Sequence, residues 1–184
     1  MKTNLVNFNE NVKEQTLIIV GANGMAMVAI DIAEDMGFGN IYVLDDIIKE
    51  EPDMELLGRP IVGVPEEFEQ WIEQGFFFLA MEDSNERMEW SEKLKEKGVK
   101  FMSLVHKQAA IGQNVALGPG CLIEAGAVIA PECSIGPFSH IGAGSTLGYE
   151  CNIGKACEIG AGAHLAPETK MDLCTTVDMG AIVK

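Results

Sequence analysis

The stretch GAVIAPECSIGPFSHIGAGSTLGYECNIG (126–154) decides the fold, because an aliphatic residue recurs in it at every sixth position. The series runs without a break from Val105 to Val183, and every member is aliphatic or Met. From Ala109 onward, a small or narrow residue stands two positions before each member. Because residues two apart lie on one face of a strand, both series are predicted to point inward.

A period of six is typical of a solenoid and does not fit an amphipathic helix, whose apolar face follows a turn of 3.6 residues. The position after the apolar residue is often Gly, and we expect these glycines to adopt the unusual backbone angles of a corner. They are Gly112, Gly118, Gly136, Gly142, Gly148, Gly154 and Gly160. The pattern therefore predicts a prism with sides of six residues.

The net charge of −15 is unevenly distributed over the 184 residues. Residues 1–103 contain 9 Lys and Arg against 21 Asp and Glu, which argues against nucleic acid and anionic membranes as partners. No signal peptide and no apolar run of membrane-spanning length is found, so a cytoplasmic protein is expected. Four of the five cysteines occupy narrow inward positions of the repeat, and we expect no disulfides.

The N-terminal part begins with a strand, a glycine turn, a helix and a second strand, predicted at Thr16–Val20, Gly21–Gly24, Met25–Met36 and Ile41–Leu44. This is a βαβ unit. Its turn and helix N-terminus can face an anion, and the carboxylates of Asp45 and Asp46 after the second strand suit ribose hydroxyls. The turn has the pattern GxxG and not GxGxxG, so a nucleotide pocket and a simple strand-to-helix turn both stay open.

Further elements complete a small three-layer α/β domain. They are a strand, a helix, a strand, a helix with Ser84 as N-cap, and a last strand, predicted at Arg59–Gly63, Pro65–Gln74, Phe76–Met81, Ser84–Lys97 and Lys100–Leu104. About ninety residues are too few for a two-lobed dinucleotide fold. We therefore expect two domains, residues 1–103 and residues 104–184.

The order of these parts resembles one family over nearly the whole chain. The residues that carry the resemblance are LIIVGANG (17–24), IYVLDD (41–46), FFFLAM (76–81), LVHKQA (104–109) and STLGYECNIG (145–154). The family is that of the sialic acid O-acetyltransferases and nucleotide-sugar N-acetyltransferases, including the UDP-aminosugar enzymes of bacillosamine synthesis. It implies a Rossmann-like nucleotide-sugar domain and a left-handed parallel β-helix with three sides and 18 residues per coil. It also implies acetyl-CoA as co-substrate and a homotrimer with active sites between neighbouring β-helices.

The resemblance also implies a set of site residues. Gly21, Asn23, Gly24, Asp45 and Asp46 would hold the nucleotide sugar, Tyr149 and Glu150 would be catalytic, and Glu158 and Ala166 would lie at the coenzyme. Other members have His followed by an acidic residue at the catalytic pair, so Tyr149 replaces the base. A tyrosine with a pKa of about 10 is ionised in only about one molecule in a thousand at pH 7.

Two other histidines are alternative bases, and both, His140 and His164, are predicted to be exposed and to point outward. No close His pair suits a metal, so no metal is expected. Two functions then stay open, an acetyl-CoA-dependent acyltransferase with a non-standard base and a catalytically silent trimeric nucleotide-sugar-binding or assembly protein. An NAD-binding redox sensor is less consistent with the short glycine motif.

Overall fold

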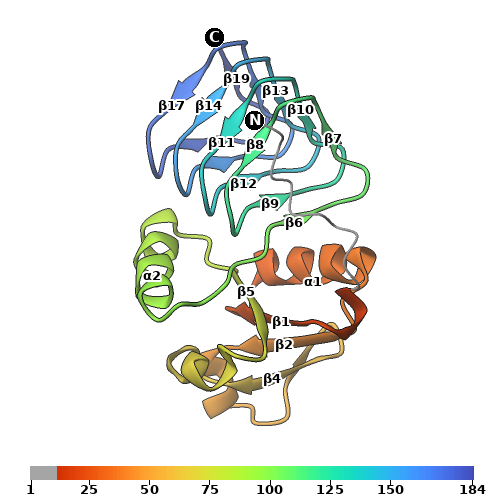
Figure 1. Cartoon of the computed structure of the whole chain (residues 1–184), viewed down its shortest axis with the longest axis vertical. Helices are drawn as coiled ribbons and strands as arrows, with labels where there is room; N and C mark the ends of the chain where they lie inside the picture. The colour runs from red at the N-terminus through yellow and green to blue at the C-terminus, as the bar shows by residue number, and fades with distance from the viewer. Residues whose placement is uncertain (1–11) are drawn as a thin grey trace. The chain divides into compact units, whose positions relative to one another are not determined.

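The structure is a computed structural model, and it describes residues 12–184. Among these residues the chain divides into two compact units, one ending at Met102 and the other running from Ser103 to Lys184 (Figure 1). The first is an α/β unit and the second is built from short parallel strands.

The first unit contains a five-stranded sheet with the order β3-β4-β2-β1-β5. Its strands are β1 (Thr16–Val20), β2 (Asn40–Leu44), β3 (Glu55–Leu56), β4 (Arg59–Gly63) and β5 (Gly75–Leu79). Strands β4, β2, β1 and β5 run parallel, and β3 is antiparallel to β4. The residues of β1 are apolar after Thr16 and fully buried, as expected for a central strand covered on both faces.

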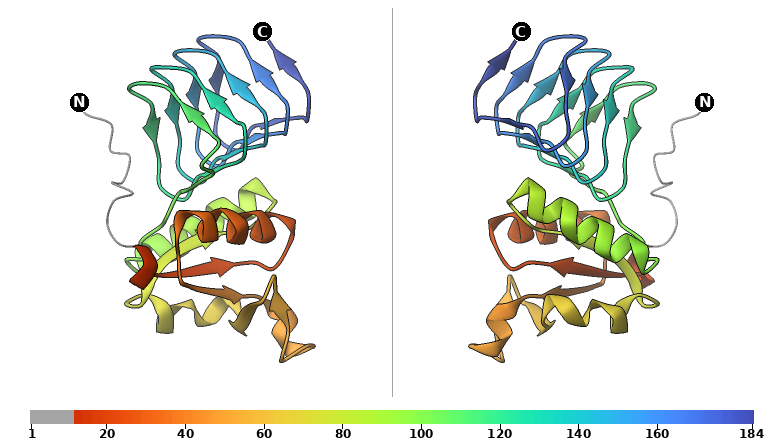
Figure 2. Two further views of the ribbon diagram at one scale, coloured as in Figure 1. Left: turned by 90° about the vertical axis from the view of Figure 1, so that its right-hand side faces the viewer. Right: turned by 90° about the vertical axis from the view of Figure 1, so that its left-hand side faces the viewer.

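Helices lie on both faces of this sheet. They are α1 (Gly24–Met36), α2 (Ser84–Glu96) and the 3₁₀ helices η1 (Val12–Glu14), η2 (Asp46–Lys49) and η3 (Pro65–Trp71). Figure 2 shows α1 nearest the viewer in one panel and α2 nearest in the other. Helix α2 packs on η3 through an edge-to-face contact between Phe68 and Trp90, whose ring centroids are 6.5 Å apart. Right-handed connections that run in opposite directions along a sheet place their helices on opposite faces, so the parallel strands are covered on both sides.

The helix predicted at Pro65–Gln74 forms as the 3₁₀ helix η3, which ends at Trp71. Two other local predictions for this unit were wrong. The N-cap of α2 is Asp83 and not Ser84, since the Asp83 carboxylate accepts the N–H groups of Asn85 and Glu86, both at 2.9 Å. No strand forms over 100–104, because only Phe101 bridges to β5 before the chain leaves the sheet edge and Leu104 joins the second unit.

The second unit is a three-sided parallel β-helix. Each strand has two residues and pairs with the strand 18 residues further on, as Val128 does with Thr146. The sides are β6-β9-β12-β15-β18, β7-β10-β13-β16-β19 and β8-β11-β14-β17. The strands are β6 (Leu104–Val105), β7 (Ala110–Ile111), β8 (Ala116–Leu117), β9 (Leu122–Ile123), β10 (Val128–Ile129), β11 (Ser134–Ile135), β12 (His140–Ile141), β13 (Thr146–Leu147), β14 (Asn152–Ile153), β15 (Glu158–Ile159), β16 (His164–Leu165), β17 (Lys170–Met171), β18 (Thr176–Val177) and β19 (Ile182–Val183).

Both sequence series point into this prism, as predicted. The aliphatic series forms its core, with Ile123, Ile141 and Ile159 fully buried. The narrow positions hold thiols that donate to backbone carbonyls, such as Cys133 Sγ to the oxygen of Gly148 at 3.0 Å. All five cysteines are free. The thiols therefore act as small core residues with weak hydrogen bonds.

The role predicted for the glycines after each apolar residue was wrong. Positive φ occurs instead one position before each narrow residue from Val115 onward, and seven of these twelve residues carry side chains, such as Glu150 with a φ of 59°. Gly118 has no positive φ, but a Cβ on it would lie 2.5 Å from the backbone nitrogen of Pro137. These glycines are required because the next coil passes close above them.

Candidate functional site

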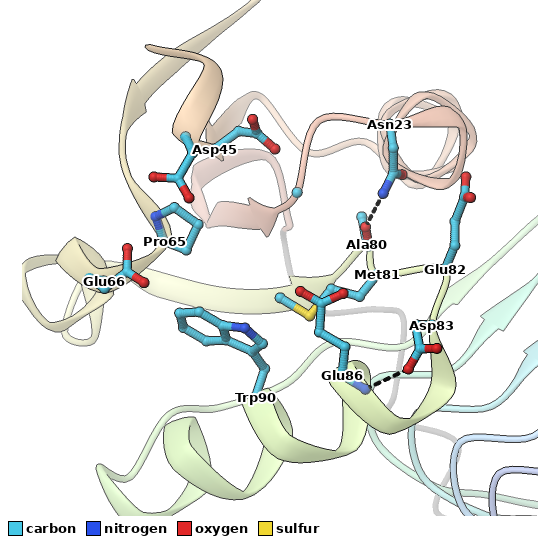
Figure 3. A pocket seen from close by; sticks show the side chains of 12 residues that line it. Asn23, Asp45, Pro65, Glu66, Ala80, Met81, Glu82, Asp83, Glu86 and Trp90 are labelled. Carbon is cyan, nitrogen blue, oxygen red and sulfur yellow. Dashed lines mark hydrogen bonds between the residues drawn. The ribbon is translucent and has the colours of Figure 1, made fainter. Parts of the chain in front are cut away.

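A pocket of about 440 Å³ opens at the carboxyl ends of the parallel strands (Figure 3). Gly21 follows β1, Asp45 follows β2, and Ala80 to Asp83 follow β5. Both α-helices also begin here. The lining residues are Gly21, Asn23, Asp45, Asp46, Pro65, Glu66, Ala80, Met81, Glu82, Asp83, Glu86 and Trp90. In an open α/β sheet this edge is where ligands bind.

The glycine turn is fixed by two contacts with the end of β5. Gly21 has a φ of 107°, and a Cβ on it would lie 2.5 Å from the carbonyl oxygen of Ala80, so only Gly fits. Asn23 caps α1 by accepting the N–H of Ala26 at 3.1 Å, and its Nδ2 donates to the same Ala80 oxygen at 2.6 Å. The helix N-terminus is thereby held at the wall of the pocket.

Asp45 joins the glycine turn to the end of β2. Its Oδ2 accepts the N–H of Ala22 at 2.7 Å, and its Oδ1 accepts the N–H of Ile47 at 2.9 Å. Asp46 is exposed, and its carboxylate lies 2.5 Å from Nζ of Lys49. The first carboxylate therefore shapes the pocket, while the second is available at its rim.

The predicted nucleotide residues meet largely at this pocket. Gly21, Asn23, Asp45 and Asp46 line it, whereas Gly24 begins α1 and is not a lining residue. Sequence reasoning missed Pro65, Glu66, Ala80, Met81, Glu82, Asp83, Glu86 and Trp90. The rule that ligands bind at carboxyl ends of strands, applied to the end of the third parallel strand, would have pointed to several of them.

The predicted catalytic pair lies on one corner of the β-helix, between β13 and β14. Tyr149 is 50% exposed, and Glu150 is exposed with left-handed backbone angles. Ala166 lies one coil further at the same corner, where its carbonyl oxygen is 3.3 Å from Sγ of Cys151. Glu158 is in β15 on another side of the prism. Within this chain, three of the four residues predicted for catalysis and coenzyme binding are neighbours, and Glu158 is not.

The prediction that His140 is an exposed surface residue was wrong. Its side chain is only 14% exposed, with Nε2 2.6 Å from a carboxylate oxygen of Glu124 and Nδ1 2.5 Å from one of Glu158. Burial alone would lower the pKa of His140, but the hydrogen bonds and charges of the two carboxylates outweigh it and raise the pKa to about 9. Imidazolium is therefore the stable form of His140 at neutral pH.

The pKa of Glu124, the partner of His140, is shifted in the opposite direction. Burial raises its pKa, but the hydrogen bond and charge of His140 and the N–H of Ala143, at 3.0 Å, lower the pKa below its ordinary value. His164 is exposed as predicted, and its Nδ1 lies 2.7 Å from Oγ1 of Thr146. His106 Nδ1 accepts the N–H of Gln108 at 3.0 Å.

The described residues contain neither a metal-binding cluster nor a membrane-spanning helix. Over residues 12–184 no three His, Cys, Asp or Glu side chains are arranged to hold a metal ion. In the same range, none of the helices has the length and apolar character needed to cross a membrane.

Comparison with known proteins matches each unit to a family model. Residues 16–94 match the PglD N-terminal domain, and residues 114–149 match the bacterial transferase hexapeptide, which comprises six repeats. Perosamine N-acetyltransferase from Caulobacter crescentus, solved with CoA and GDP-perosamine, is 25% identical with a TM-score of 0.80, covering 92% of this chain and 88% of that one.

Two more distant structures share the fold. The acetyltransferase domain of PglB from Neisseria gonorrhoeae is 21% identical with a TM-score of 0.82, covering 92% of this chain and 91% of that one. WeeI from Acinetobacter baumannii is 18% identical with a TM-score of 0.81, covering 92% of this chain and 81% of that one.

The chain therefore combines a PglD-type N-terminal domain with a hexapeptide-repeat left-handed β-helix. The predicted fold class is confirmed, and so is the resemblance to the nucleotide-sugar N-acetyltransferase family. The identity of Tyr149 as the residue that replaces the catalytic His stays a prediction.

Proposed function

We propose that this protein is an acetyl-CoA-dependent acetyltransferase that acts on a nucleotide-linked amino sugar or a sialic-acid-like sugar. One observation carries the proposal. The same two domains, in the same order, align over 92% of the chain with an N-acetyltransferase that was solved with CoA and a nucleotide sugar. The pocket at the carboxyl edge of the sheet supports it, since such an edge suits a nucleotide.

The nucleotide end of the acceptor would lie in that pocket. Asp45 and Asp46 would accept ribose hydroxyls, and Gly21, Asn23 and Gly24 would present the N-terminal end of α1. The amino or hydroxyl group of the sugar then attacks the thioester carbonyl, a base takes its proton, and CoA leaves as a thiolate that is protonated. Backbone N–H groups can stabilise the oxyanion that forms in between.

Tyr149 and Glu150 are the pair we propose for proton transfer, with Glu158 and Ala166 at the coenzyme. Their position on the β-helix supports a shared role for Tyr149, Glu150 and Ala166, which gather at one corner. Glu158 could join them only from a neighbouring subunit. A homotrimer formed through the β-helix would bring the two sides together. Sedimentation equilibrium at micromolar concentration should give three times the mass of one chain, and a monomer mass would contradict this arrangement.

The reaction is expected in the cytoplasm, where acetyl-CoA is available and where free thiols persist. All five cysteines are free in this structure, which agrees with a reducing compartment. The acidic surface of the chain fits partners other than nucleic acid or anionic membranes.

The test is an acetyl-transfer assay that measures thiol release from acetyl-CoA with a panel of GDP- and UDP-linked 4-amino sugars. Turnover is expected with the wild type. Replacement of the base or its orienting acid, in Tyr149→Phe and Glu150→Gln, should lower kcat about 100-fold or more. Glu168→Gln is the matched control, because Glu168 lies one coil beyond Glu150 with the same backbone conformation, φ 63° against 59°.

A catalytically silent nucleotide-sugar-binding or assembly protein is the second candidate. The state of His140 favours it. Both ring nitrogens of His140 face carboxylates, and its raised pKa keeps it protonated at neutral pH, so it cannot serve as the general base. Nucleotide binding without thiol release for any acceptor would support this second function.

A further inference from the structure

The pocket of the α/β unit is rich in hydrogen-bond acceptors and poor in donors. Six carboxylates line it, from Asp45, Asp46, Glu66, Glu82, Asp83 and Glu86. The only lining side chains with N–H groups are Asn23, which already donates to Ala80 at 2.6 Å, and Trp90. No Lys, Arg, His, Ser, Thr or Tyr is among the lining residues. A ligand group in this pocket must therefore bring its own donors.

Three of the carboxylates are already used within the protein. Asp45 and Asp83 accept backbone N–H groups, and Asp46 pairs with Lys49. In the described part of the chain, the carboxylates of the other three, Glu66, Glu82 and Glu86, make no hydrogen bond or ion pair. Since no three acidic side chains in residues 12–184 are arranged to hold a metal ion, these carboxylates are best explained as single acceptors.

An aromatic ring lies beside these free acceptors. Trp90 and Glu86 are four residues apart on α2, so their side chains share one face of the helix. Figure 3 shows the Trp90 indole with Glu86 on one side and Glu66 on the other. Phe68 meets the ring edge-on, and Nζ of Lys93 lies 4.0 Å from its centroid. The ring is thereby held in place, and because Lys93 covers one face without lining the pocket, a flat base can stack only on the face of Trp90 that lines the pocket.

The four common bases differ in what they offer a carboxylate. Uracil, like thymine, presents one N3–H donor flanked by two carbonyl acceptors, O2 and O4, so a carboxylate that accepts the N3–H would meet a carbonyl oxygen beside it. Adenine and cytosine offer one amino group beside a ring nitrogen that is itself an acceptor. Guanine offers N1–H and the N2 amino group side by side, which matches the two oxygens of one carboxylate.

We infer that this pocket selects a guanine nucleotide, with the base stacked on Trp90 and its N1–H and N2–H groups donated to the carboxylate of Glu86. Glu66 closes the opposite side of the ring and adds to the exclusion of uracil. The inference rests on the proposed function, since it names the nucleotide that carries the acceptor sugar.

Calorimetric titration of the whole chain with GDP, IDP, UDP, ADP and CDP tests the inference. GDP is expected to bind about 5- to 100-fold more tightly than UDP, the discrimination typical of one bidentate pair. IDP lacks the N2 amino group and should lose most of this advantage. Glu86→Gln should weaken GDP and strengthen UDP, because the amide can donate to a uracil carbonyl. Glu92→Gln, on the same helix but outside the pocket, should change neither.

Equal or tighter binding of UDP by the wild type would overturn the inference, as would a GDP affinity unchanged in Glu86→Gln. Quenching of Trp90 fluorescence by GDP, lost in Trp90→Leu and kept in Trp71→Phe, would support the stacking. The acetyl-transfer assay separates the two proposals. Turnover with a UDP-linked sugar would overturn the guanine inference and leave the acetyltransferase proposal standing. Selective GDP binding without any turnover would overturn the acetyltransferase proposal and leave the guanine inference standing.

Discussion

Nε2 of His140 lies 2.6 Å from Oε1 of Glu124, and this contact joins neighbouring coils of the β-helix. His140 is in β12, Glu124 follows β9 one coil before it, and Glu158 is its register partner in β15 one coil after it. One imidazolium therefore links three successive coils through two carboxylates. Because all three side chains are mostly buried, the contact is screened by solvent much less than a surface ion pair.

The free energy of unfolding should fall as the pH rises and His140 loses its proton. The pKa of His140 is raised from 6.5 to about 9 in the folded state, so its contribution is complete below pH 6.5 and is lost as pH rises toward 9. The loss should be on the order of 2 to 3 kcal/mol. Guanidinium unfolding at pH 6, 7.5 and 9 measures it. In His140→Gln the decrease between pH 6 and 9 should be absent, and an equal decrease in the variant would contradict the assignment.

The two adjacent aspartates after β2 should differ in their effect when replaced. Asp45→Ala removes the acceptor for two backbone N–H groups and should cost about 1 to 2 kcal/mol of stability. It should also weaken nucleotide binding, since the glycine turn loses its tie to β2. Asp46→Ala removes only an exposed pair with Lys49 and should change stability by less than about 0.5 kcal/mol. Urea unfolding of both variants gives the comparison, and equal losses would show that the Asp45 contacts do not hold the turn.

Much of this fold follows from local patterns, and the parts that do not are those set by tertiary contacts. The sixfold apolar series predicts the β-helix because every coil repeats the same inward positions, and TLIIV followed by a glycine turn predicts β1 and α1. A coil of 18 residues places Glu158 beside His140, but the series cannot show that the carboxylate of Glu124 also reaches His140, because that contact depends on side-chain packing between coils. Glu66 and Trp90 reach the pocket from separate helices, so no spacing in the sequence relates them to Gly21.

Two glycines of the β-helix, Gly144 and Gly118, are needed for different reasons, which the sequence does not show. The difference gives a further prediction. Gly144 has a φ of 66° with open space around a Cβ, so Gly144→Ala should cost about 1 to 2 kcal/mol from backbone strain alone. The fold already tolerates this conformation at Ala156, with a φ of 50°. Gly118→Ala would place a Cβ 2.5 Å from the Pro137 nitrogen and force two coils apart, with a larger loss. Thermal unfolding followed by circular dichroism ranks the two, and a smaller loss for Gly118→Ala would contradict the close-approach explanation.

The charge of the pocket predicts an unusual dependence of nucleotide affinity on salt. Nucleotide sites lined by Lys and Arg bind more weakly as salt rises, because the attraction between protein and phosphate is screened. Here the lining has six carboxylates and the whole chain has a net charge of −15, so a nucleoside diphosphate is repelled at long range. Raising the ionic strength from about 0.01 M to about 0.1 M shortens the Debye length from about 30 Å to about 10 Å and should tighten GDP binding.

Uncharged guanosine is the matched ligand for this measurement, since it carries the same base and ribose without phosphate. Its affinity should change little over the same range of salt, because no long-range repulsion acts on it. A difference in slope between GDP and guanosine would then report the repulsion between the acidic protein and the diphosphate. If GDP binding weakened with salt, a basic group would have to contact the diphosphate, and the nucleotide would then extend from the pocket toward Lys or Arg side chains outside the lining.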